Sequence, residues 1–409
     1  MNPVPCPAAN SLAPVRRPAG DLSYPVFRLA IAGDPVSIIL KLVGEVCNLD
    51  CSYCYEKRKP YEGKRILRAA EVETFLLSLP NTELAIELHG GEPLLYPREE
   101  FVALSKVLAR LGERLVRLTI QTNGTLLDRE MVRFLMARFP LLQIGISVDG
   151  PPDLNVYRVD NHGRSSSGTV ATGLAACAAE DVAVGVICVV TRLSIGQVDR
   201  ILRYFVQQPA VKMLKLVPCF DTNVLQELGP FRRPEIRALI KQSGCGSLPW
   251  AITPAEYTEF LNEALMLWTA EIGPDHYMLE PAISTLRAIR SLPLSNCHFG
   301  AHKCSHVYTL YPDGAIGSCD ELERRATTYG KLGETNALEA ARLQWGERMP
   351  KDVQQLLAMC NSCEAAPVCG GGCLATRRRM LSVCQAEAYC DHRKALIKDV
   401  QQLLTWAGA

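Results

Sequence analysis

Apolar, β-branched runs alternate with amphipathic segments up to residue 218, and this alternation limits the possible folds more than any other feature. Strands are expected at residues 37–43, 84–89, 118–122, 142–148, 182–191 and 213–218. Helices are expected between them, at 67–79, 98–113, 127–139, 168–180 and 195–208. Strand–helix alternation at this spacing predicts a parallel sheet with right-handed crossovers. The sequence therefore predicts an α/β fold, an open or partial (β/α)6 barrel of the TIM-like kind.

The pattern changes after residue 218. Two helices are expected at 254–272 and 281–291, each with a proline where a first turn tolerates it. From Cys297 the alternation stops, glycines and cysteines dominate up to Cys390, and a final helix is expected at 392–406. The sequence thus predicts four parts, which are an N-terminal arm (1–35), the barrel (36–235), a helical bridging region (236–296) and a cysteine-rich domain (297–409).

Short polar motifs follow the first four predicted strands directly. In chain order they contain Cys47, Cys51 and Cys54, then Gly90-Gly91-Glu92, then Asn123, and then Ser147 and Asp149. In parallel barrels the carboxyl ends of the strands converge on one face. The topology therefore predicts that these motifs share a site. Taken singly, each has a structural alternative, because Gly90-Gly91, Asn123-Gly124 and Asp149-Gly150 are also common turn signals.

The chain has 17 cysteines, which is too many for an ordinary cytoplasmic enzyme. Its N-terminus has no basic start followed by an apolar block, so neither a secretory signal nor a disulfide framework is expected. Clustered cysteines in the cytosol are typical metal ligands. The loop Cys47-x3-Cys51-x2-Cys54 offers three thiols, whereas a 4Fe–4S cluster is normally held by four. Three thiols would leave one iron open to a reactive ligand; part of a zinc site is the alternative.

This three-cysteine loop after the first strand resembles the signature of the radical S-adenosylmethionine (radical SAM) superfamily. The resemblance implies that SAM chelates the open iron and is cleaved to a 5′-deoxyadenosyl radical, which abstracts a substrate hydrogen. It implies that Gly90, Gly91 and Glu92 hold the SAM ammonium, and that Ser147 and Asp149 contact its carboxylate and ribose. Further cofactor contacts are expected from Tyr53 beside the adenine, from Asn123, and from Arg158, for which a solvated surface charge is the alternative.

The cysteine spacing near the C-terminus resembles, position for position, the SPASM extension of radical SAM enzymes that act on peptides and proteins. The pattern is Cys304-x9-Gly314-x4-Cys319, then Cys360-x2-Cys363-x5-Cys369-x3-Cys373, and finally Cys390. By resemblance, one auxiliary 4Fe–4S cluster is held by Cys297, Cys304, Cys319 and Cys373, and a second by Cys360, Cys363, Cys369 and Cys390. With the SAM cluster this makes three. A pair of four-cysteine zinc sites is the alternative, and Cys384 is an alternative to Cys390.

The substrate motifs resemble two subfamilies. The expected function is that of a peptide maturase, which crosslinks a ribosomally made precursor peptide through a cyclophane carbon–carbon bond. His89 before the two glycines, and Tyr157 to Asp160, carry this resemblance. The alternative is an anaerobic sulfatase-maturing enzyme, which oxidises Cys or Ser to formylglycine. That subfamily usually follows its third cysteine with two tyrosines, whereas this chain has Tyr55-Glu56. It places a catalytic base where this chain has Asp320, for which a helix start is the structural alternative.

Composition narrows the remaining possibilities. A net charge of +1 gives no reason to expect nucleic acid or an anionic membrane as partner, and no apolar run is long enough to span a bilayer. A cytoplasmic enzyme is expected, with a precursor peptide as substrate and a flavodoxin or ferredoxin as electron donor. The 35 residues before the barrel are too few for a peptide-binding domain, so recognition would use the barrel, the cysteine-rich surface or a separate protein. An iron–sulfur carrier or scaffold is the non-enzymatic alternative.

Overall fold

The computed structural model describes residues 26–28, 31, 33–58, 65–81, 83–220, 233–243, 248–294, 296–322, 324–334 and 351–407. Its strands form one ten-stranded sheet in the order β10-β9-β8-β1-β2-β3-β4-β5-β6-β7. The expected arm at 1–35 lies mostly outside the described residues, as do Cys6 and Cys245. Within the described part, no helix is both long and apolar enough to span a membrane.

Seven parallel strands make up most of the sheet, paired in chain order. They are β1 (Val36–Lys41), β2 (Leu84–His89), β3 (Leu115–Thr122), β4 (Leu142–Ser147), β5 (Val184–Val190), β6 (Val211–Pro218) and β7 (Met278–Glu280). All six predicted strands are present. β7 was not predicted, because three residues carry too little pattern to be recognised.

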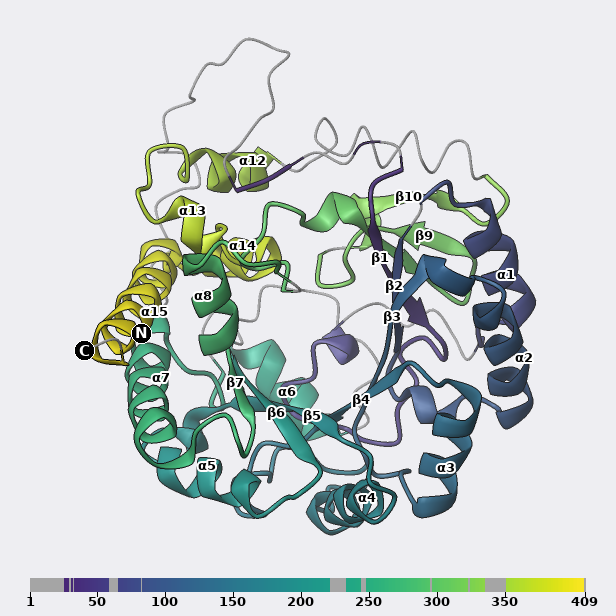
Figure 1. Ribbon diagram of the computed structural model, residues 1–409, viewed down its shortest axis with the longest axis horizontal. Coiled ribbons are helices and arrows are strands. Elements are labelled where there is room, and N and C mark those ends of the chain that lie inside the picture. Colours follow the sequence, from purple (N-terminus) through teal and green to yellow (C-terminus); the bar gives the residue numbers. More distant parts are fainter. Residues whose placement is uncertain are drawn as a thin grey trace.

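The predicted crossover helices lie on the outside of the curved sheet (Figure 1). They are α1 (Ala69–Ser78), α2 (Arg98–Ala109), α3 (Arg129–Arg138), α4 (Ser167–Ala179) and α5 (Val198–Val206). Local signals fix their ends; for example, the Asp128 side chain accepts a hydrogen bond from the Met131 backbone at the start of α3. Apolar side chains between the helices and the sheet form the core, so the loops at the carboxyl ends of the strands rest on a packed support.

Three further strands lie in the cysteine-rich region, where the sequence analysis expected the strand–helix alternation to stop and located no strand. They are β8 (Val307–Leu310), β9 (Ala315–Gly317) and β10 (Thr328–Lys331). β8 pairs parallel with β1, and Ser37 lies opposite Val307. All four β8 residues are buried, so no alternation of polar and apolar residues marked this strand in the sequence. The pairing brings the C-terminal region directly against the first strand of the barrel.

The remaining α-helices are α6 (Pro234–Gln242), α7 (Pro254–Leu267), α8 (Ala282–Ile289), α9 (Arg324–Thr327), α12 (Lys351–Ala358), α13 (Ala366–Cys369), α14 (Leu374–Ser382) and α15 (Ala386–Ala407). In Figure 1, α7 and α15 lie on the left and α12 lies at the top, whereas α6 lies nearer the middle. The last helix, α15, begins six residues before the expected start at 392 and packs on α7 and α8. This packing ties the end of the chain to the bridging helices.

Candidate active site at the carboxyl ends of the parallel strands

A cavity of about 470 Å³ lies at the carboxyl ends of the parallel strands. Its wall includes the three thiols of the loop after β1, namely Cys47, Cys51 and Cys54. It also includes Cys373, which precedes α14 in the C-terminal region. Cysteines from two regions that are far apart in the sequence therefore face one cavity.

Gly91 allows the loop before Cys47 to approach the end of β2 closely. The Gly91 backbone N–H donates to the Gly44 carbonyl at 2.7 Å, and that of Glu92 donates to the Val46 carbonyl at 2.9 Å. A Cβ atom on Gly91 would lie 2.2 Å from the Val46 oxygen and 2.6 Å from the Glu45 oxygen. Only glycine fits at position 91. The two glycines therefore make a local backbone turn and can also take part in the site.

The Glu92 carboxylate lies behind the cavity wall. It accepts hydrogen bonds from the backbone N–H groups of Asn123 (2.7 Å) and Leu94 (2.9 Å) and from the Thr122 hydroxyl (2.7 Å). The residue is fully buried, and burial raises the pKa of its carboxyl to about 7, although these hydrogen bonds lower it. Glu92 therefore fastens the end of β2 to the end of β3.

Asn123 connects the end of β3 to the cysteine loop. Its side-chain N–H group donates to Asn48 Oδ1 at 2.8 Å and lies 3.7 Å from the sulfur of Cys47. Its own Oδ1 accepts from the backbone and hydroxyl of Thr125. Asn123 thus makes the turn that the sequence allows and also orients the first cysteine of the loop.

Asp149 is also buried. It lies behind Tyr53 and Arg158, which line the cavity. Its carboxylate accepts from Arg158 Nε at 2.9 Å, from the Val189 backbone N–H at 3.0 Å and from the Tyr53 hydroxyl. The Arg158 guanidinium lies over the Tyr53 ring, 5.4 Å from its centroid. Arg158 is 7% exposed, so it is not the solvated surface charge that was the alternative. Asp149 holds Tyr53 and Arg158 in the cavity wall.

Ser147 faces the cavity at the end of β4. Gln121 Nε2 donates to its hydroxyl at 2.8 Å, and both side chains belong to the cavity lining. Of the residues predicted to contact SAM, Tyr53, Gly90, Gly91, Asn123, Ser147 and Arg158 line the cavity, whereas Glu92 and Asp149 support its wall.

Four C-terminal cysteines form one group near β8 and the start of α14. Burial raises the pKa of the Cys304 thiol, and the charges of Cys373 and Cys297 raise it further. Burial likewise raises the pKa of Cys319, together with the charge of Cys304 and then those of other neighbours, including Cys373 and Cys297. Such mutual effects require proximity. The structure therefore brings together Cys297, Cys304, Cys319 and Cys373.

The second C-terminal group lies between α12 and α15. Burial raises the pKa of the Cys390 thiol, Arg377 lowers it, and the charges of Cys360 and Cys369 raise it. Cys363 follows Cys360 within one turn, and its N–H donates to the Cys360 carbonyl at 3.2 Å. Cys384, the alternative to Cys390, is disulfide-bonded, which the sequence analysis did not expect. Cys390 is a free thiol and is the better candidate of the two.

The spacing of the sulfurs argues against zinc. Four thiolates at 2.3 Å from one zinc ion would place their sulfurs ~3.8 Å apart. Among the described residues, which include all eleven candidate cysteines, the one group with three His, Cys, Asp or Glu ligand atoms within 4.8 Å of one another is Glu56, His89 and Asp320. No three of the candidate cysteine sulfurs that the structure describes lie within 4.8 Å of one another, a spacing that is compatible with the larger multi-iron cluster.

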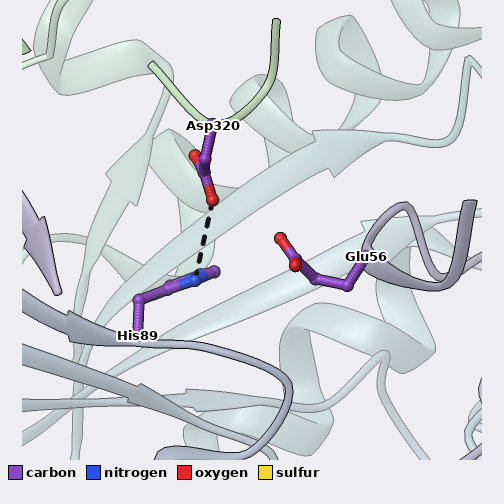
Figure 2. Close-up of side chains that lie close together, drawn as sticks. All are labelled: Glu56, His89 and Asp320. Atoms are coloured by element: carbon purple, nitrogen blue, oxygen red, sulfur yellow. Dashed lines mark ion pairs between the residues drawn. The ribbon is translucent and has the colours of Figure 1, made fainter. Parts of the chain in front are cut away.

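The group of Glu56, His89 and Asp320 contains the residue predicted to act as the base, Asp320. Figure 2 shows these three side chains pointing toward one another from separate segments. Lys41, at the end of β1, supplies the cation between them. Its Nζ lies 2.7 Å from Glu56 Oε1, 3.0 Å from Asp320 Oδ2 and 3.3 Å from His89 Nδ1. Lys41 is fully buried. The lysine ammonium therefore already occupies the position that a metal ion would take.

Lys41 also contacts the His89 ring. An ammonium can only donate hydrogen bonds, so His89 Nδ1 is the acceptor in its contact with Lys41 Nζ. His89 and Glu56 line the cavity, whereas Asp320 lies behind them and is 5% exposed. The sequence analysis missed the roles of Lys41 and Glu56. A lysine ending an apolar strand was the available signal for the first.

Comparisons with known proteins agree with this geometry. Residues 42–205 match the Radical SAM superfamily. The cysteine-type anaerobic sulfatase-maturating enzyme of Clostridium perfringens is 23% identical over 350 residues, which cover 83% of this chain and 89% of that one. The serine-type anaerobic sulfatase-maturating enzyme of Bacteroides thetaiotaomicron is 25% identical over 356 residues, or 83% and 82% of the two chains.

Two solved structures share the fold. Native anSMEcpe with bound AdoMet and Cp18Cys peptide superposes with a TM-score of 0.72 at 21% identity, over 91% of this chain and 99% of that chain. Streptococcus suis SuiB bound to precursor peptide SuiA superposes with a TM-score of 0.55 at 14% identity, over 85% and 73%. The similarity extends well beyond residues 42–205 and includes the cysteine-rich C-terminal region.

Proposed function

We propose that this chain, which carries a radical SAM domain at residues 42–205, oxidises a side chain of a peptide substrate by two electrons. One observation carries the proposal. The wall of a single cavity contains the three-thiol loop and also Cys373 of the first C-terminal group. A substrate side chain in this cavity can meet a radical generator on one side and an electron acceptor on the other.

The cysteines would hold three 4Fe–4S clusters, one on Cys47, Cys51 and Cys54 and one on each C-terminal group. When bound, SAM and its cluster supply a 5′-deoxyadenosyl radical that takes a hydrogen atom, and an auxiliary cluster accepts the second electron. Gly90 and Gly91 let the backbone approach the cofactor, with Tyr53, Asn123, Ser147 and Arg158 as side-chain contacts. Glu92 and Asp149 position these groups. A flavodoxin or ferredoxin would supply the first electron.

Asp320 is the proposed proton acceptor. It follows Cys319 and is oriented by Lys41, and it lies behind Glu56 and His89 in the cavity wall. A proton released from the substrate at this side of the cavity would pass to a carboxylate held beside an auxiliary cluster. The non-enzymatic alternative, a carrier or scaffold, gives no reason for a large cavity beside a three-thiol loop.

The favoured product is a crosslink within a precursor peptide. The hydrogen atom leaves a β-carbon, that carbon bonds to an aromatic ring carbon, and the ring then loses one electron and one proton, so the peptide loses two hydrogens in all. Glu56 supports this choice. It stands where sulfatase-maturing enzymes usually have a second tyrosine, and it pairs with Lys41 next to Asp320. This chain therefore differs from the sulfatase-maturing enzymes on the side of the cavity where Asp320 would accept the proton.

Formylglycine formation is the second candidate. The relatives named above include both cysteine-type and serine-type sulfatase-maturating enzymes, and the similarity to them covers most of both chains. Their reaction shares the first steps of the proposed one and differs in the fate of the oxidised carbon, which becomes an aldehyde.

Tandem mass spectrometry of a peptide encoded beside this gene, co-expressed with the enzyme without oxygen, tests the proposal. Loss of two hydrogens, without fragment ions between the joined residues, is expected for the crosslink. A product that reacts with a hydrazine probe would identify the aldehyde of the second candidate. Absence of 5′-deoxyadenosine after anaerobic reduction with SAM would contradict both and favour a carrier.

A further inference from the structure

Arg377 is a buried arginine directed at the second C-terminal cysteine group. It lies on α14, which begins after Cys373 of the first group, and its backbone N–H donates to the Cys373 carbonyl at 2.9 Å. The side chain is 2% exposed. Its Nη1 donates to the sulfur of Cys360 at 3.3 Å and to the Gly371 carbonyl at 3.3 Å. One short helix thus connects the two cysteine groups.

The other terminal nitrogen of Arg377, Nη2, is buried and has no hydrogen-bond partner within the part of the chain that the structure describes. A guanidinium is always charged, and burying it costs several kcal/mol unless an anion accepts its hydrogen bonds. Among the residues that the structure describes, no carboxylate forms an ion pair with Arg377, although both neighbouring arginines have one. Arg378 pairs with Asp352 at 2.6 Å, and Arg379 pairs with Glu321 at 2.8 Å. The anion that accepts hydrogen bonds from Arg377 is therefore expected at the cysteines of the second C-terminal group.

The first C-terminal group also has a buried cation, but that cation is used differently. Lys303 donates to the carbonyls of Cys297 (2.8 Å), Gly372 (3.0 Å) and His298 (3.4 Å). An ammonium has three N–H donors, so these carbonyls account for all of them. Lys303 can act on the first C-terminal cysteine group only through its charge. Arg377 acts on the second group through its charge and through a hydrogen bond to the Cys360 sulfur.

We propose that Arg377 is a positioning residue for the auxiliary cluster on Cys360, Cys363, Cys369 and Cys390, and that it raises the reduction potential of this cluster. The inference rests on the proposed function, because it requires a cluster at these four cysteines. Reduction adds one negative charge, and a buried cation that donates to sulfur stabilises the reduced form. The second cluster then accepts an electron from the first more readily, which directs electrons away from the cavity.

The test uses the full chain with Cys47, Cys51 and Cys54 changed to Ala, so that only the auxiliary clusters remain after anaerobic reconstitution. A redox titration followed by electron paramagnetic resonance gives two midpoint potentials in this parent protein. Arg377→Met is expected to shift one of them to a more negative value and to leave the other in place. Arg377→Lys, which keeps the charge but loses the planar fork, is expected to give a smaller shift.

Arg378→Met is the matched control, since it removes the neighbouring arginine and is expected to change neither potential. Unchanged potentials in both Arg377 variants, with iron retained, would overturn the inference. If Arg377→Met loses iron, the midpoint potentials of Arg377→Lys decide. A shift in one of them supports the inference, and unchanged potentials overturn it. Iron for fewer than two clusters in the parent would instead refute the cluster assignment of the proposed function, and the iron analysis reports that failure separately from any potential.

Discussion

The ammonium of Lys41 lies 3.0 Å from the Oδ2 atom of Asp320, although 279 residues separate them in the sequence. Lys41 ends the first strand of the barrel, and Asp320 follows Cys319 in the C-terminal region. The same ammonium lies 2.7 Å from Glu56, just after the three-cysteine loop. One buried cation therefore holds together the two regions that carry the candidate clusters.

Replacing Lys41 is expected to destabilise the whole fold. Lys41→Met would remove the ammonium that pairs with the buried carboxylates of Asp320 and Glu56, and breaking a buried ion pair in this way costs about 3–5 kcal/mol. Urea unfolding followed by circular dichroism without oxygen measures the loss. Arg164→Met is the control, because Arg164 pairs with Asp160 at an exposed position, where ion pairs contribute little. An equal, small effect of both variants would contradict the structural role of Lys41.

Asp320→Asn is expected to separate the two halves of the reaction. The amide keeps the size of the side chain but accepts a proton poorly, so SAM cleavage should continue while the peptide product is lost. Chromatography of 5′-deoxyadenosine and mass spectrometry of the peptide from the same anaerobic reaction give both readouts. A wild-type yield of product in this variant would remove Asp320 from the mechanism.

Glu92 is expected to make stability depend on pH near neutrality. Burial raises the pKa of its carboxyl from 4.5 to about 7, so the folded chain binds this proton more tightly than the unfolded chain does. The stabilisation is fully present below pH 4.5 and is lost as the pH rises to about 7, a change on the order of 3 kcal/mol at 1.36 kcal/mol per unit.

Glu92→Gln should flatten this dependence, which urea midpoints between about pH 5 and about pH 8 would show. Glu99→Gln, on the exposed side of α2, is the control and should retain the wild-type slope. The same slope in Glu92→Gln as in the wild type would mean that another group causes it.

Gly91→Ala is expected to disturb the cysteine loop without unfolding the barrel. The new Cβ would lie 2.2 Å from the Val46 oxygen, so the loop before Cys47 must move away from β2. Iron bound at the loop and SAM cleavage should both fall sharply, measured in a variant that lacks the C-terminal cysteines as ligands. Gly168→Ala, where no atom lies within 4 Å of the added Cβ, should leave both unchanged.

Much of the barrel could be predicted because its pattern is local. Strand and helix periodicity located β1 to β6 and α1 to α5 within a few residues, because each element shows its own alternation of buried and exposed positions. The short strands β7 to β10 were missed, since three or four residues carry no period. The pairing of β8 with β1 depends on segments far apart in the sequence, which no local signal specifies.

The sequence by itself determined the set of candidate cluster ligands, because the thiols after β1 and in the C-terminal region stand at the spacings on which the iron–sulfur prediction rests. Only the tertiary structure decided which residues surround these thiols. It placed Cys47 and Cys373 in one cavity wall, moved Glu92 and Asp149 behind that wall, and brought Lys41 to Asp320 and Arg377 to Cys360. The physical reason is that a buried charge must find its partner across the fold, and partners that are distant in sequence meet only after the strands have paired.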